Sequence, residues 1–293
     1  MTDLDLPDAT ALRGAAETLL VPLACRARAS REKLVDRFAD PTAEALCSRF
    51  AIDLGRYASG HALVRGVVHR GRWFDARIAR FLASRPEATV LSLGSGLNTM
   101  YERLRDRVPE GSWRWIDSDL EAVVRLRRAV MADDPRRATL VFDAAGGDLP
   151  DHPWIGAAEE LLVVSEAALI YVGEAEVAAF FRRLAAFGRA RRHCGIVFDW
   201  CSPEMVRHSR ANPGLKALRD EGVVFVSALR RAGDIAAYDP AWRIVAESSA
   251  SMAHASVGSA LFDGLFRLAT RGRRFYGLAE AELAGSAGRR PQA

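Results

Sequence analysis

The chain has 293 residues and a mass of 32.0 kDa, and 49% of its residues are hydrophobic and 27% charged. This composition excludes a collagen-like, mucin-like or largely disordered protein, and the length predicts one large α/β domain or two smaller ones. The net charge is +4, but the 41 basic and 37 acidic side chains are interspersed without a long basic block. We therefore interpret the arginines as solvated helix faces and expect no nucleic-acid partner.

The cysteines and the apolar stretches bear on metal binding and location. No Cys-x-x-Cys pair occurs and no histidines stand at zinc-ligand spacing, so we expect no metal. The N-terminus lacks the residue order of a signal peptide, which predicts reduced thiols in the cytoplasm. The most apolar stretch, Leu161 to Val172, contains Glu166 and is shorter than the about 20 residues that cross a bilayer, so we expect no membrane partner. The cysteines are Cys25, Cys47, Cys194 and Cys201.

The first part of the chain, residues 1–86, is predicted to be a helical N-terminal cap. Apolar residues recur at helical spacing in three segments of it. Asp40, which is followed by a proline, predicts a helix start, because aspartate is a good N-cap and proline fits the first helical position. The three segments are Ala24 to Phe38, Ala43 to Phe50 and Trp73 to Leu82.

From residue 87 to 285, short apolar or β-branched runs alternate with helical patterns, which is typical of βαβ units on a parallel sheet. Two later runs, Trp242 to Glu247 and Arg274 to Gly277, are expected to pair antiparallel. The predicted fold is α/β: a Rossmann-like, doubly wound, mostly parallel sheet with helices on both faces, followed by a disordered tail at 286–293. The predicted parallel strands are Thr89 to Leu93, Ser112 to Ile116, Ala138 to Val141, Leu161 to Val164 and Gly195 to Phe198, and the main helices between them are Asp119 to Met131 and Glu174 to Ala190.

A glycine turn follows the first predicted strand, in the sequence Leu93-Gly94-Ser95-Gly96-Leu97-Asn98-Thr99. In a doubly wound sheet, ligands bind at the carboxyl ends of the strands, and glycine lets a cofactor approach the backbone there. A tight turn without a ligand is the alternative, although it accounts for one glycine more easily than for two. The nicotinamide fingerprint has a third glycine where this chain has Thr99, which weakens a nicotinamide interpretation.

Carboxylates follow the next three predicted strands. Asp119 lies about 20 residues beyond the glycine turn, where an acidic side chain contacts ribose hydroxyls, although a helix cap is the alternative. Asp143 ends the following strand and is either an acceptor for an adenine amine or a loop residue. Glu166 follows a very apolar strand, and a carboxylate in so dry a place must be paired or hydrogen-bonded, which favours a functional role.

Seven blocks of the chain carry a family resemblance through their order and rough spacing. They are Arg28-Ala29, Asp40-Pro41-Thr42-Ala43, Arg70-Gly71-Arg72-Trp73-Phe74-Asp75, Leu93 to Thr99 with Arg103-Leu104, Ile116-Asp117-Ser118-Asp119-Leu120, Asp143, and Ser165-Glu166 with Tyr171. Together they resemble the leucine carboxyl methyltransferase family, and within it the branch of polyketide O-methyltransferases of the tetracenomycin type. The resemblance runs from about Arg28 to Asp199 and implies a class I S-adenosylmethionine-dependent methyltransferase.

This resemblance implies S-adenosylmethionine as the cofactor and S-adenosylhomocysteine as the product. It assigns Arg70 to the carboxylate of the cofactor and Glu166 to its ammonium group. A zwitterionic amino-acid tail also needs one fixed cation and one fixed anion, and arginine offers a bidentate fork to a carboxylate. The resemblance places Gly94 and Gly96 at the methionine and ribose region.

The same resemblance assigns Asp119 to the ribose hydroxyls, Asp143 to the adenine side and Tyr171 to the wall near the transferred methyl group. The family usually has aspartate where this chain has Asn98, so we do not expect a direct electrostatic role for that position on the cofactor. The segment Asp199 to Tyr238 does not align with the family, and we expect it to hold determinants for the acceptor.

The predicted function is O-methyl transfer to a small-molecule acceptor, at either a carboxylate or a phenolic hydroxyl. A carboxylate needs a cationic or hydrogen-bonding clamp, whereas a phenol is helped by a base whose pKa is near the working pH. Arg207 and His208, after the last parallel strand, are the candidates for these two roles. Two alternatives stay open: a catalytically silent cofactor-binding homologue, and a nicotinamide oxidoreductase. Four aromatic residues are expected in the core rather than in an acceptor pocket: Phe180, Phe181, Trp200 and Trp242.

Overall fold

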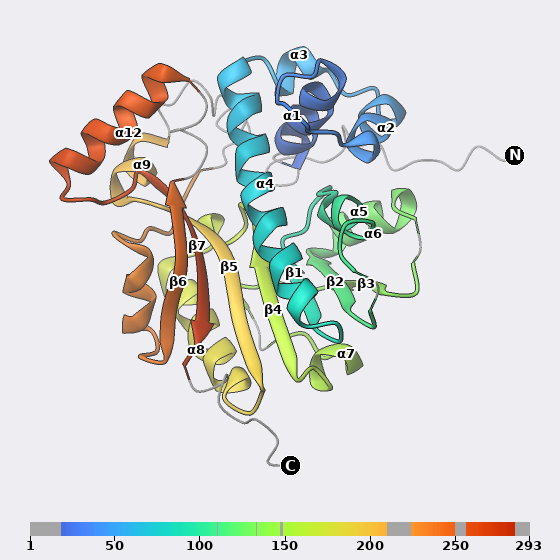
Figure 1. The fold of residues 1–293 in the computed structure, drawn as a ribbon, viewed down its shortest axis with the longest axis vertical. Coiled ribbons are helices and arrows are strands. Elements are labelled where there is room, and N and C mark those ends of the chain that lie inside the picture. The colour runs from blue at the N-terminus through green and yellow to red at the C-terminus, as the bar shows by residue number, and fades with distance from the viewer. Residues whose placement is uncertain are drawn as a thin grey trace, which may run out of the picture.

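Seven strands form one sheet in the order β3-β2-β1-β4-β5-β7-β6 (Figure 1). The first five strands in this order pair in parallel, whereas β7 runs antiparallel to both β5 and β6. The expected α/β fold with an antiparallel C-terminal pair is therefore confirmed. The strands are β1 Thr89–Leu93, β2 Arg114–Asp119, β3 Arg137–Val141, β4 Glu160–Ser165, β5 His193–Cys201, β6 Trp242–Ser249 and β7 Tyr276–Leu283. The structure, a computed structural model, describes residues 19–109, 111–132, 134–146, 149–209, 224–249 and 256–284.

The central strands are apolar because helices cover them on both sides. Every residue of β1 and of β5 is buried, as in parallel sheets generally. The prediction for β7 was wrong in its bounds, because the strand begins at Tyr276 rather than Arg274. Its glycine and alanine residues weaken the apolar pattern of this strand in the sequence. Packing requires one of them, Gly277, to be small. A Cβ atom at Gly277 would lie 2.3 Å from the indole ring of Trp200.

Helices pack on both faces of the sheet (Figure 1). α4, His61–Ser84, packs on one face through Phe74 and other apolar residues. α8, Glu174–Gly188, packs on the other face through Phe181. The four aromatic residues expected in the core all belong to the cluster around α8. The other helices are α1 Leu20–Arg31, α2 Pro41–Arg49, α3 Leu54–Tyr57, α5 Met100–Leu104, α6 Glu121–Val130, α7 Pro153–Gly156, α9 Pro203–His208 and α12 Val257–Ala269, with 3-10 helices at Leu169–Tyr171 and Ala232–Ala237.

The N-terminal helices share α4 with the sheet. α1, α2 and α3 enclose a separate apolar core to which the first half of α4 contributes Val64, Val67 and Val68. The second half of α4 then crosses the sheet, so this helix joins the two cores (Figure 1). The boundary expected at residue 86 falls just after α4, and the tail expected at 286–293 lies outside the described residues.

A buried guanidinium fixes these helices to the loop after β1. Arg103, on α5, donates two hydrogen bonds of 2.8 Å to Asp75 on α4 and one of 3.1 Å to the Oδ2 atom of Asp40. The Oδ1 atom of Asp40 accepts a hydrogen bond of 2.9 Å from the backbone of Ala43, so the predicted N-cap of α2 is confirmed. Because three helices meet at Arg103, the helical cap and the glycine turn have a fixed relative position.

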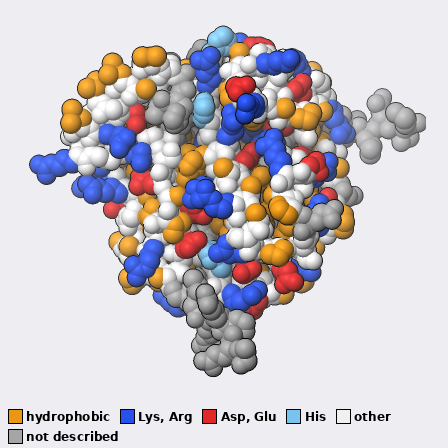
Figure 2. Space-filling model, in the orientation of Figure 1, with side chains coloured by type: hydrophobic (Ala, Val, Ile, Leu, Met, Phe, Trp, Pro, Cys, Tyr) orange, Lys and Arg blue, Asp and Glu red, His pale blue; other side chains and the backbone are white. Residues whose placement is uncertain are grey.

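The surface mixes charges of both signs on the face shown in Figure 2. Hydrophobic side chains gather over α12, where the exposed apolar residues are Val257, Leu261, Phe262, Leu265 and Leu268. In the part of the chain that the structure describes, no helix has both the length and the apolar character needed to span a membrane. Nor do these described residues include a group of three or more His, Cys, Asp or Glu placed to hold a metal.

Candidate active site

The glycine turn adopts a backbone that only glycine tolerates without strain. Gly94 has φ 55° and Gly96 has φ 49°, both in the left-handed region. A Cβ atom at Gly94 would lie 2.5 Å from the Cβ of Ala168, and one at Gly96 would lie 2.6 Å from the Cδ2 of Leu19. The turn therefore sits directly against the loop after β4 and against the start of the helical cap.

Arg127, on α6, holds the glycine turn from beneath. Its Nη1 atom donates to the backbone carbonyls of Ser95, Gly96 and Asn98 at 3.3, 2.7 and 3.1 Å. Its Nη2 atom donates to Asp117 at 2.7 Å, and both side chains are almost fully buried. The sequence does not predict this role for Arg127, because one arginine among several on an amphipathic helix has no distinguishing pattern.

Asp119, at the end of β2, faces the same turn. Its Oδ2 atom accepts a hydrogen bond of 2.7 Å from the backbone N–H of Gly96, and its Oδ1 atom accepts one of 2.7 Å from Leu120. Burial raises the pKa of this carboxyl, although the two N–H donors oppose the rise. The N-cap of α6 is Leu120, without a side-chain cap bond, so the alternative role of Asp119 as the cap of α6 is not what the structure shows.

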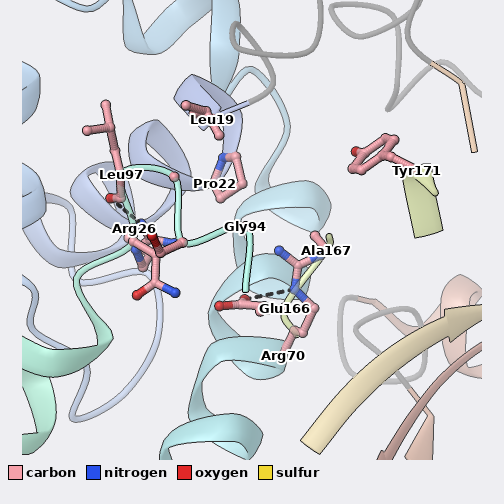
Figure 3. A pocket seen from close by; sticks show the side chains of 12 residues that line it. Leu19, Pro22, Arg26, Arg70, Gly94, Leu97, Glu166, Ala167 and Tyr171 are labelled. Atoms are coloured by element: carbon pink, nitrogen blue, oxygen red, sulfur yellow. Dashed lines mark hydrogen bonds and ion pairs between the residues drawn. The ribbon is translucent and has the colours of Figure 1, made fainter. Parts of the chain in front are cut away.

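Arg70 and Glu166 meet from opposite sides of the site. Arg70 lies on α4 and Glu166 follows β4, and the Nε of the arginine donates a hydrogen bond of 2.9 Å to the Oε1 of the glutamate (Figure 3). Burial alone raises the pKa of Glu166, but the neighbouring guanidinium groups of Arg70, Arg26 and Arg103 hold it below its usual value. A fixed cation and a fixed anion therefore lie side by side.

Arg26 is a second buried cation at this place, and the sequence analysis missed it. It lies on α1, where its Nη2 donates to the backbone carbonyl of Leu97 at 3.1 Å (Figure 3). Its Nε lies 3.3 Å from Asp40 but has no hydrogen-bond partner among the described residues. The block Arg28-Ala29, which carries part of the family resemblance, lies two residues further along α1. The side chain of Arg28 donates to Glu32 and to the carbonyl of Ala58.

Two adjoining cavities open at this edge of the sheet. The smaller cavity, of about 60 Å³, has both charged and apolar walls; its charged and turn residues are Arg26, Arg70, Gly94, Gly96, Asn98 and Glu166. The larger cavity, of about 620 Å³, is of the size that holds small ligands. Its wall includes Asp119, Leu120, Val123, Phe142 and Asp143. Leu19, Gly94, Ala167 and Tyr171 line both cavities, so all six residues predicted to bind the cofactor border one continuous region.

The family model described as leucine carboxyl methyltransferase matches residues 20–185, more than half of the chain. The chain belongs to the leucine carboxyl methyltransferase family. The resemblance drawn from the sequence is thereby confirmed, and with it the class of S-adenosylmethionine-dependent methyltransferases.

Two known proteins are similar to this chain in sequence. Tetracenomycin polyketide synthesis O-methyltransferase TcmP of Streptomyces glaucescens is 31% identical over 212 residues, which cover 70% of this chain and 73% of TcmP. S-adenosyl-L-methionine-dependent methyltransferase dpfgK of Gibberella zeae is 30% identical over 188 residues, which cover 59% of this chain and 61% of dpfgK. A crystal structure of a presumed methyltransferase from Thermobifida fusca YX shares the fold, with a TM-score of 0.53 and 14% identity over 97% of this chain and 99% of that chain.

Asn98 has a structural role where the family usually has aspartate. Its Oδ1 atom accepts a hydrogen bond of 2.6 Å from the backbone N–H of Met100 at the start of α5. An amide oxygen serves this contact as a carboxylate oxygen would. The amide at this position therefore supplies the acceptor atom that the start of α5 uses.

The three residues predicted to act in catalysis lie in different places. Tyr171 lines both cavities, and its ring centroid lies 5.5 Å from that of Phe225. Arg207 lies on α9 with 68% of its side chain exposed, and it pairs with Glu204 at 3.8 Å. The Nδ1 atom of His208 lies 2.7 Å from the carbonyl of Glu204, and this side chain is exposed. The structure brings Tyr171 to the site, whereas Arg207 and His208 border neither of the two cavities.

Proposed function

We propose that this member of the family transfers the methyl group of S-adenosylmethionine to an oxygen atom of a small metabolite, either a carboxylate or a phenolic hydroxyl. The observation that carries the proposal is the Arg70–Glu166 pair at one end of a continuous region whose other part is lined by Asp119, Asp143 and apolar side chains. Similarity to TcmP, a polyketide synthesis O-methyltransferase, supports oxygen as the acceptor atom and a polyketide-type metabolite as the substrate.

The residues of the site fit the parts of this cofactor. Arg70 and Arg26 suit the carboxylate of its amino-acid end. The Nε atom of Arg26 has no hydrogen-bond partner among the described residues. Glu166 suits the ammonium group, because its neighbours keep it ionised. Asp119 suits the ribose hydroxyls, since each of its oxygens has a further lone pair beyond the N–H bond it already accepts.

The adenine suits the larger cavity, whose wall there is apolar. Leu120 is half exposed although it is a large hydrophobic residue, and it lines this cavity together with Val123 and Phe142. An aromatic base that covers such a side chain removes apolar surface from water. Asp143 stands at the same wall, and its Oδ1 atom accepts a hydrogen bond of 2.9 Å from the backbone N–H of Ala145.

The chain's contribution to the reaction is to position groups and exclude water. When bound, the cofactor would supply the methyl group of its sulfonium, which would pass in line to the acceptor oxygen while S-adenosylhomocysteine departs as the leaving group. The protein needs no covalent intermediate and gains rate by holding the reactants in contact. Tyr171 borders the junction of the two cavities, and burial raises the pKa of its hydroxyl. This hydroxyl therefore stays protonated near neutral pH, where it can donate a hydrogen bond but cannot act as a base.

Calorimetric titration tests the cofactor site. We expect binding of S-adenosylmethionine and S-adenosylhomocysteine and no binding of NAD. Glu166→Gln and Asp119→Asn should each weaken S-adenosylhomocysteine binding by about 10- to 100-fold, because each removes a charged hydrogen-bond acceptor. Asp106→Asn is the matched control, since 80% of that side chain is exposed and it lines neither cavity. Unchanged affinity in both site variants would remove the assignment.

A turnover assay tests the acceptor. S-adenosylhomocysteine release is measured with a panel of phenols and aromatic carboxylic acids, and the methylated product is identified by mass spectrometry. An O-methylated phenol or a methyl ester supports the proposal. Cofactor binding without turnover on any acceptor favours the silent homologue, and an N- or C-methylated product refutes the proposed chemistry.

A further inference from the structure

Behind the Arg70–Glu166 pair lies a second layer of buried polar groups. The Nη1 atom of Arg70 donates a hydrogen bond of 3.0 Å to the hydroxyl of Tyr276 on β7. That hydroxyl donates in turn a hydrogen bond of 2.6 Å to the Oδ2 atom of Asp199 on β5. Arg70 itself comes only within 3.9 Å of this carboxylate, so the tyrosine hydroxyl is the link between the two charges.

Asp199 also holds the backbone next to Glu166. Both of its carboxylate oxygens accept from the backbone N–H of Ala167, at 3.0 and 2.9 Å. Ala167 has φ 53°, a left-handed conformation that is costly for a residue with a Cβ atom. The residue after it, Ala168, is the one that a Cβ at Gly94 would strike. Asp199 therefore stabilises the strained turn that carries Glu166 and touches the glycine turn.

Neither Tyr276 nor Asp199 borders the two cavities of the proposed cofactor site. Each nevertheless contacts one of the two residues proposed to bind the amino-acid end of the cofactor, or the backbone beside it. Tyr276 contacts Arg70, and Asp199 contacts the backbone after Glu166. Packing of β5 against β7 does not need these polar atoms, because apolar side chains fill the same core at lower desolvation cost. Their arrangement matches what orienting a guanidinium and a carboxylate requires.

We propose that Tyr276 and Asp199 are positioning residues that orient Arg70 and Glu166 for the amino-acid end of S-adenosylmethionine. This inference rests on the proposed function of the site. It predicts that the pair acts on ligands that carry an amino-acid end and leaves the adenosine end unaffected. Adenosine recognition falls instead to Asp119 and the apolar wall of the larger cavity.

The test is Tyr276→Phe, which removes one oxygen and keeps the ring. Dissociation constants are measured by calorimetry for S-adenosylhomocysteine and for 5′-methylthioadenosine, which lacks the amino-acid end. We expect S-adenosylhomocysteine to bind about tenfold more weakly and 5′-methylthioadenosine to bind as in the wild type, because the lost hydrogen bond oriented a charged group. Tyr238→Phe is the control, since that half-buried ring packs against Phe181 on the other face of the sheet.

A double-mutant cycle separates positioning from general stability. If Tyr276 acts through Arg70, then adding Tyr276→Phe to an Arg70→Gln variant should change S-adenosylhomocysteine affinity by less than about twofold. Equal weakening of both ligands, no weakening of either, or full additivity with Arg70→Gln would overturn the inference. Failure of the wild type to bind S-adenosylhomocysteine would overturn the proposed function as well, so the two failures are distinguishable.

Discussion

The protonation of Asp199 makes a testable contribution to stability. This carboxyl is fully buried, and burial raises its pKa from the usual 3.8 to about 6, against the opposing effects of Arg70, the Tyr276 hydroxyl and the Ala167 N–H; Glu166 adds to the rise. Because the folded-state pKa exceeds the unfolded one, the native state binds the proton more tightly. The stabilisation is complete below pH 4 and is lost as the pH rises through about 6.

The size of the effect follows from the pKa difference. Each pH unit between the two pKa values is equivalent to about 1.4 kcal/mol, so the group accounts for about 3 kcal/mol in full and about 2 kcal/mol between pH 4.5 and 7.5. Asp199→Asn removes this titration. As the pH rises from 4.5 to 7.5, the wild type should lose about 2 kcal/mol that the variant does not lose. The free energy of unfolding of the variant minus that of the wild type should therefore become more positive by about 2 kcal/mol.

Urea denaturation at four pH values between 4.5 and 7.5 measures this difference. The comparison with the wild type cancels the other titrating groups. Asp106→Asn serves as the control, and its difference from the wild type should stay flat, because exposed charges interact weakly. A constant difference for Asp199→Asn, or one that shrinks as the pH rises, would refute the assignment of a raised pKa to this carboxyl.

Three further predictions concern the glycine turn. Gly96→Ala should lower the free energy of unfolding by about 1–3 kcal/mol in a urea titration, because of its positive φ and the contact with Leu19, whereas Gly264→Ala in exposed α12 should raise it by about 1 kcal/mol. Arg127→Met should cost about 3 kcal/mol in the same assay, since three carbonyls and Asp117 lose a buried donor; a cost below about 1 kcal/mol would contradict this role. Asn98→Asp should leave the calorimetric affinity for S-adenosylhomocysteine within about threefold, because its Oδ1 serves the backbone of α5; a tenfold change would indicate direct contact with the ligand.

The parts of the fold that the sequence predicted are those with strong local patterns. Thr89 to Leu93 was placed without error, because a buried run of apolar residues ends abruptly at a glycine. The strand Tyr276–Leu283 was misplaced, because glycine and alanine interrupt its apolar pattern and Gly277 is fitted to the ring of Trp200, which is far away in sequence. Local composition does not contain that packing partner.

The residues of the candidate site also differ in whether the local sequence could predict them. Asp119, Asp143 and Glu166 were predicted because each lies at or just after the end of a strand, and the carboxyl ends of parallel strands meet at one edge. Tyr276 was not found, because it contacts Arg70 across 206 residues of chain. Arg207 was expected at the site because it follows β5 closely, yet α9 presents it to solvent. A residue that closely follows a strand in sequence belongs to the site only when the chain after the strand stays beside the cavities.

The amino-acid end of the proposed cofactor site is a buried charge network rather than two separate side chains. Its members are Arg26, Arg70, Arg103, Asp40, Asp75, Glu166 and Asp199. Desolvation offsets most of the attraction in such buried pairs, so apolar packing of equal volume would stabilise the fold at least as well. The benefit lies in binding, because charges that are already held by protein partners need little reorganisation when a zwitterion enters. The network therefore trades stability for a preorganised site, and its residues come from the N-terminal helices, from α5 and from the ends of β4 and β5.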